Sequence, residues 1–342
     1  MNSLSSLLHS ALAPFRIAFP ALTSALPSAK LVFVSTPEEI QTTPPVSSIP
    51  ADSYSDVAAA GTGLPTSIVP DPDNPPWNMK TAVLTWLGSV GILLGISLFS
   101  SLIALFYVLM TYGKVKGEEL TRLITSDKMA VLIQVSGVIP VHLLTLVLVW
   151  IVVTGRGKRP FWRTLGWRFN NKLEPLLSVL LAVGLLVFGG VLTKYYGGDP
   201  TDIDQIINSS TASRLVLAFL ATATAPLVEE IVYRGILYSA LQRAIGVAWA
   251  VVAVSILFMA VHIAQYYNNI SVIAAIGVLS LALTLVRAYT KSLLPCFIIH
   301  LVFNGLQSLY IIFQPYLTNP EAAPTQKAGV VIIGQFLGAC VL

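Results

Sequence analysis

Residues 223–241 read ATAPLVEEIVYRGILYSAL, a stretch that places two adjacent carboxylates in an otherwise apolar run. Besides Glu229 and Glu230, the only acidic residue between positions 205 and 342 is Glu321. Acidic side chains are costly inside a membrane, where they usually serve function or are paired with a cation. The pair therefore indicates a functional or ionic site within a membrane-spanning helix.

The composition is that of an integral membrane protein. Of the 342 residues, 55% are hydrophobic and only 11% are charged, whereas about a quarter of the residues of a soluble domain are charged. A helix needs about 20 apolar residues to cross the hydrocarbon core of a bilayer, and several runs here meet that length. The net charge of +4 is small and its basic residues lie between the apolar runs, which argues against nucleic acid as a partner.

The apolar runs predict an all-α, polytopic membrane bundle of about seven to eight spans. Residues 1–78 are rich in Pro and Ser and predict a flexible extension. Residues 79–154 hold the first two spans, and 155–342 form the remaining transmembrane core. The predicted spans are 81–110, 129–153, 173–195, 211–243, 247–264, 272–287 and 293–313, with a short final segment at 328–342.

Charge in the loops predicts the orientation of the spans. The segment 155–172 has six Lys or Arg and no acid, whereas 196–210 has three aspartates and no Lys or Arg. Because basic loops stay on the cytoplasmic side, we expect 155–172 in the cytoplasm and 196–210 outside. The expected membrane is the plasma, or cell inner, membrane.

The spacing of the charged residues predicts different environments for the two glutamates. Glu230 and Arg234 are four residues apart, so they can form an ion pair on one helix face. Glu229 points about 100° away and is left without this partner. The structural alternative is that both glutamates form one ion cluster near the helix end, helped by Arg243.

Three further polar residues lie in apolar segments of the C-terminal half. His262 and His300 are two of the four histidines in the chain, and Asn304 follows His300 by one helical turn. We expect His300 and Asn304 to converge on one polar atom. Each histidine alone is also explained as a hydrogen-bond partner between helices, and we interpret His142 as a packing residue.

Three short motifs contain these residues in a fixed order. EEIVYR at 229–234 matches EExxxR, FMAVH at 258–262 matches FxxxH, and HLVFN at 300–304 matches HxxxN. The ordered set resembles the signatures of the CAAX protease and bacteriocin-processing family, also called Abi, over about residues 155–315. Some members of this family are type II CAAX prenyl endopeptidases.

The resemblance implies an intramembrane endopeptidase, folded as a helix bundle with a conical cavity that opens to the cytosol. It implies that Glu229 and His262 activate a water, and that His300 and Asn304 stabilise the oxyanion. The motif residues near this site are Glu230, Arg234 and Phe258. The bilayer and a peptide, or a prenylated protein, are the implied partners.

Several alternatives stay open at this point. Glu229, His262 and His300 also make a plausible three-ligand zinc site, although no HExxH is present; we favour a glutamate-dependent mechanism without a cofactor. A non-enzymatic role in immunity or regulation is the alternative function. A transporter is the third candidate, but the chain lacks the paired broken segments typical of one.

Overall fold

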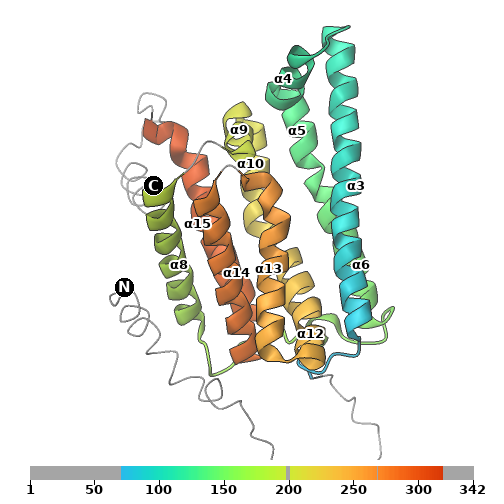
Figure 1. Cartoon of the computed structure of the whole chain (residues 1–342), viewed down its shortest axis with the longest axis vertical. Helices are drawn as coiled ribbons and strands as arrows, with labels where there is room; N and C mark the ends of the chain where they lie inside the picture. Colours follow the sequence, from blue (N-terminus) through green and yellow to red (C-terminus); the bar gives the residue numbers. More distant parts are fainter. Residues whose placement is uncertain (1–70, 198–200, 268, 319–342) are drawn as a thin grey trace, which may run out of the picture. The chain divides into compact units, whose positions relative to one another are not determined.

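In the computed structural model, residues 71–197, 201–267 and 269–318 are described, and they form an all-α bundle without strands (Figure 1). Seven helices of this part are long and apolar enough to cross a membrane, which confirms the predicted fold class. The predicted segment 328–342 lies outside the described residues. The seven candidate spans are Met79–Tyr112, Lys128–Thr154, Pro175–Tyr196, Thr211–Ile245, Val247–Tyr266, Ile270–Thr290 and Leu294–Pro315.

Several spans contain more than one helical element. The elements are α3 (Met79–Tyr112), α4 (Glu118–Ser126), α5 (Lys128–Ser136), α6 (Val138–Thr154), α7 (Phe161–Thr164), α8 (Pro175–Tyr196), α9 (Asp202–Ser209), α10 (Thr211–Phe219), η4 (Leu220–Thr224), α11 (Ala225–Glu229), η5 (Glu230–Leu237), α12 (Tyr238–Ile245), α13 (Val247–Tyr266), α14 (Ile270–Thr290) and α15 (Leu294–Thr318). The two elements labelled η are π-helical.

The second span contains two helical elements and approaches α3 closely. The span predicted over 129–153 is confirmed as Lys128–Thr154, in which α5 and α6 meet at Gly137, whose backbone dihedrals are right-handed helical. A Cβ atom on Gly137 would lie 2.1 Å from Ser100 Oγ of α3, so only glycine permits this close approach.

The fourth span, predicted as one helix over 211–243, alternates α and π turns. The π-helical elements η4 and η5 flank the short helix α11, which ends at Glu229. Single π turns are rare and often occur at functional sites. This irregular helix carries both glutamates of the sequence motif.

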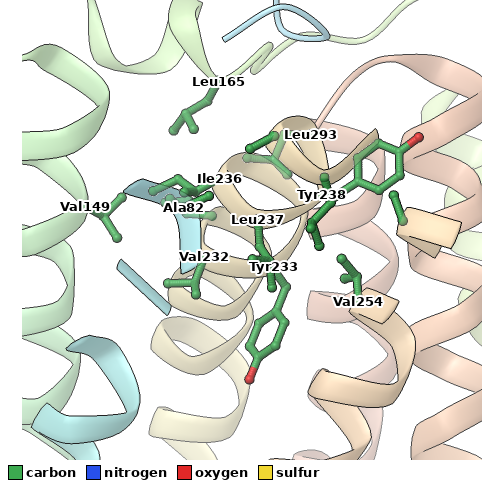
Figure 2. Close-up of a cluster of buried hydrophobic side chains, with 14 of the residues drawn as sticks. Ala82, Val149, Leu165, Val232, Tyr233, Ile236, Leu237, Tyr238, Val254 and Leu293 are labelled. Carbon is green, nitrogen blue, oxygen red and sulfur yellow. The ribbon is translucent and has the colours of Figure 1, made fainter. Parts of the chain in front are cut away.

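The main hydrophobic core lies at the end of the bundle where α12 ends and α15 begins. Its buried residues include Trp77, Leu165, Ile236, Leu237 and Leu293. Figure 2 shows η5 and α12 contributing side chains to the centre of this cluster, with neighbours from the other elements around them. The cluster fills this end of the bundle with packed apolar side chains.

The segment before α3 is attached to this same end. The sequence assigns 71–78 to the flexible extension, yet Arg243 donates hydrogen bonds to Pro75 O and Trp77 O. Trp77 Nε1 donates to Ile236 O over 3.1 Å. Arg243 therefore holds this segment and does not join the glutamates, as the structural alternative supposed.

An ion pair anchors the start of the segment. The Arg287 side chain is fully buried, and its Nη1 lies 2.9 Å from Asp73 Oδ1. Lys291 Nζ lies 3.1 Å from the other carboxylate oxygen. Burial of Asp73 raises its pKa, but the charge and hydrogen bond of Arg287, with hydrogen bonds from Lys291 and Gln242, lower the pKa below its usual value overall.

We predict that Asp73→Asn lowers the free energy of unfolding by about 1–3 kcal/mol at pH 7, because it leaves the Arg287 charge poorly compensated. A carboxyl with a lowered folded-state pKa stabilises the fold above its unfolded pKa of about 4, and this contribution disappears as pH falls through the folded pKa. The difference between variant and wild type should therefore shrink at pH 3. Thermal unfolding in detergent measures it. Asp71→Asn, at an exposed position that keeps an acceptor oxygen, is the control, and equal effects of both substitutions would contradict the prediction.

Candidate active site

Pro226 determines how the fourth span turns. In η4 the Ala225 N–H donates to Leu220 O, five residues earlier. Pro226 has no N–H, so the carbonyl of Ala221 has no regular backbone donor left. Asn304 of α15 supplies one, because its Nδ2 donates to Ala221 O over 3.0 Å. The last residue of the HxxxN motif therefore joins α15 to the π turn.

Glu230 lies in a fully buried ion network. Its Oε1 is 3.1 Å from Arg234 Nη1, and neither side chain is exposed. The same oxygen is 2.8 Å from His300 Nδ1. Arg234 also donates to the backbone and hydroxyl oxygens of Ser280 and to Thr284 Oγ1. The predicted i, i+4 pair is therefore present, and it connects η5 to α14 and α15.

The ring of Phe258 separates this network from His262. The Arg234 guanidinium carbon lies 4.5 Å from the ring centroid, a cation–π distance. The imidazole centroids of His262 and His300 lie 4.8 and 6.0 Å from the same ring. The phenylalanine of the FxxxH motif therefore packs against both histidine rings.

Glu229 has a different environment from its neighbour. About 24% of its side chain is exposed, whereas the Glu230 side chain is fully buried. Glu229 Oε2 lies 3.7 Å from His300 Nε2. Glu229 is thus the carboxylate that faces open space, with a histidine beside it.

Backbone contact sets the orientation of the His262 ring. Nδ1 lies 2.8 Å from Phe258 O, and a carbonyl oxygen can only accept a hydrogen bond. Nδ1 therefore carries the proton in the neutral ring, and Nε2 has a lone pair. This arrangement suits a group that accepts a proton or a hydrogen bond.

His300 and Asn304 have different hydrogen-bond partners within the protein. His300 Nδ1 contacts Glu230, whereas the Asn304 amide binds Ala221 O. The physical reason is the π turn, which leaves a carbonyl that regular α-helical geometry would have satisfied.

A cavity of about 700 Å³ lies beside these residues. Glu229, His262 and Asn304 line it, while His300 lies behind Glu229. Among the described lining residues, Glu229 is the one acidic side chain and none is Lys or Arg. The other side chains are apolar or polar without a formal charge. The structure thus gathers three of the four predicted site residues on one cavity wall and places the fourth next to Glu229.

The cavity extends away from the hydrophobic core. Thr125 at the end of α4, Gln205 of α9 and Tyr266 at the end of α13 belong to its lining. In Figure 1 these ends lie in the upper part of the bundle, and α12 lies at the lower end. The cavity is therefore located toward the α9 end.

His142 is a cavity residue that our sequence interpretation missed. It lies on α6, lines the same cavity, and its Nδ1 is 2.7 Å from Thr224 Oγ1 of η4. The signal was present in the sequence, because His142 is a polar residue within an apolar span, the criterion that selected His262 and His300.

A catalytic zinc needs about three protein ligands close together. Within 71–197, 201–267 and 269–318, no group of three or more His, Cys, Asp or Glu side chains could hold a metal ion. We therefore derive no step through zinc.

A family model matches part of the chain. Residues 211–306 match the family model described as type II CAAX prenyl endopeptidase Rce1-like. This segment is similar to that family. The match confirms the resemblance that the three motifs carry, and it includes Glu229, His262, His300 and Asn304. No curated protein and no solved structure matches the chain. The seven apolar helices support a multi-pass membrane protein, and the family model that matches 211–306 describes a family of proteases.

We expect the two glutamates of the CAAX protease-like core to respond differently to substitution. Glu230→Gln should lower the free energy of unfolding by about 3–5 kcal/mol, because it leaves the buried charge of Arg234 unpaired. Glu229→Gln should leave a folded but inactive protein, because this side chain faces the cavity. Thermal unfolding and activity in detergent separate the two effects. Equal destabilisation by both substitutions would refute the difference.

Proposed function

We propose that the protein is an intramembrane endopeptidase that cleaves a peptide bond with a water activated by Glu229 and His262. The observation that supports this most directly is the position of Glu229, a cavity-lining carboxylate that Arg234 does not neutralise. A purely structural ion cluster has no need of a second carboxylate exposed to a cavity.

Proton transfer begins the proposed reaction. Glu229 accepts a proton from a water held between its carboxylate and His262 Nε2. The oxygen of that water attacks the carbonyl carbon of the peptide, and the carbonyl oxygen becomes an oxyanion. Collapse of the tetrahedral intermediate breaks the C–N bond, and the proton held by Glu229 passes to the leaving nitrogen.

In this proposal His300 and Asn304 stabilise the oxyanion, Asn304 from the cavity wall and His300 through the Nε2 atom that lies beside Glu229. Asn304 uses one N–H of its amide on Ala221 O, and the amide has a second N–H to donate. His300 has carboxylates at both nitrogens, Glu230 at Nδ1 and Glu229 near Nε2, so a protonated ring is compensated. Preorganised donors in a site of low dielectric are typically worth several kcal/mol.

A cleavage assay on the purified protein tests this function. Prenylated and unprenylated peptides are incubated with wild type and with Glu229→Gln, each with and without a chelator. We expect cleavage by wild type alone, insensitive to the chelator. Reversible loss of activity with the chelator would instead support a zinc mechanism. Absence of cleavage of any peptide would favour the alternative, a non-enzymatic member of the Abi family acting in immunity or regulation.

Two expectations about the side of the membrane from which substrate enters the cavity exclude each other. The basic segment 155–172 predicts that its end of the bundle is cytoplasmic, whereas the family resemblance implies a cavity open to the cytosol. The cavity reaches Thr125 and Gln205, which lie toward the opposite end. We propose the orientation given by charge, because it rests on this chain's own residues. Access is then from the non-cytoplasmic side of the plasma membrane.

Cysteine labelling in intact cells should reveal this orientation. In a variant with Cys296 and Cys340 replaced by alanine, we expect Gln205→Cys to react with an impermeant reagent added outside. Arg163→Cys should react only after permeabilisation. The reverse labelling pattern would instead support a cavity that opens to the cytosol.

Asn304→Ala should lower kcat by about 10²–10³ with nearly unchanged substrate affinity, as for other oxyanion donors. Gln307→Ala is the matched control, since Gln307 lies on the same helix, outside the described cavity lining. A loss confined to affinity, or an equal loss in the control, would count against the oxyanion role.

A further inference from the structure

The contact between His142 and Thr224 determines which ring nitrogen faces the cavity. Thr224 Oγ1 lies 3.2 Å from Leu220 O, to which its hydroxyl donates. Its oxygen is then an acceptor for His142 Nδ1, 2.7 Å away. With the Thr224 hydroxyl donated to Leu220 O, Nδ1 carries the proton and His142 Nε2 keeps a lone pair. Among the described residues, Nε2 has no hydrogen-bond partner.

A peptide that enters this cavity brings N–H and C=O groups that lose their water. Each buried group without a partner costs free energy, of about 1–3 kcal/mol by protein mutational data. About half of the described lining residues are apolar, and the others have polar side chains that can satisfy these groups. An acceptor oriented into the cavity is one of them, and His142 Nε2 is such an acceptor.

We propose that His142 is a substrate-binding residue whose Nε2 accepts a hydrogen bond from a backbone N–H of the bound peptide. This role rests on the proposed endopeptidase function. It is assigned by none of the three sequence motifs, and His142 lies outside the segment that the family model matches.

The position of His142 connects substrate binding to the site. Its Nδ1 is held by η4, the same π turn whose Ala221 carbonyl holds Asn304. The element α6 packs directly against η4 and α11. A peptide bound by His142 therefore lies against the wall that carries Glu229 and Asn304.

Substitution of His142 by asparagine separates the contact with Thr224 from the hydrogen bond to the bound peptide. Asparagine has an amide nitrogen attached to Cγ, as Nδ1 is, but no atom corresponding to Nε2. His142→Asn can therefore keep the contact with Thr224 and lose the acceptor that faces the cavity. Leu143→Ala is the control, because Leu143 neighbours His142 on α6 and is 59% exposed on the outer face.

Binding of the fluorescein-labelled prenylated and unprenylated peptides of the cleavage assay is measured by anisotropy in a Glu229→Gln background, where no turnover interferes. We expect His142→Asn to weaken binding about 3- to 10-fold, the usual range for one hydrogen bond, with an unchanged melting temperature. Peptides with single backbone N-methyl groups identify the N–H involved. Methylation at that position should weaken binding to the Glu229→Gln protein by a similar factor and have no further effect when His142→Asn is also present.

Unchanged binding by His142→Asn, or the same N-methyl profile with and without it, would overturn the role of His142. A lower melting temperature with normal binding would also overturn it and assign a structural role. These outcomes concern His142 alone if wild type cleaves a peptide, whereas failure of cleavage refutes the proposed function itself.

Discussion

The buried ion pair of Glu230 and Arg234 is the interaction on which the rest of the site depends. Two charges without solvent exposure are tolerated only when they are paired and hydrogen-bonded, and here His300, Ser280 and the Phe258 ring also contact the pair. These partners come from α13, α14 and α15. The pair thereby fixes the relative positions of three helices around η5, and with them the positions of both motif histidines.

The second constraint is the irregular backbone of the fourth span. A regular helix through Pro226 would leave carbonyls without donors, and such groups are costly in a membrane. The structure resolves this with η4, whose free carbonyl at Ala221 is satisfied by Asn304, and with a contact from His142 to Thr224. The same adjustment that satisfies the backbone also brings α6 and α15 to the cavity wall. The backbone geometry of the fourth span therefore also determines the geometry of the site.

Much of the fold could be predicted from single residues and their spacing. Long apolar runs define the spans, because a helix must satisfy its own backbone in lipid. The i, i+4 spacing of Glu230 and Arg234 was sufficient to predict their pair, and the motif order indicated the family. Contacts between distant elements could not be predicted in this way: Gly137 lies close to Ser100 of α3, and Arg243 and Arg287 donate hydrogen bonds to the segment before α3.

The sequence by itself determined a helical membrane bundle, the paired glutamate and the set of polar residues available for chemistry, because these follow from hydrophobicity and from spacing along one helix. Only the tertiary structure decided which polar residues share the cavity, since helical periodicity relates residues within an element and says nothing of the packing between elements. For that reason His142, interpreted as a packing residue, lines the cavity wall with Glu229, while His300 lies behind it.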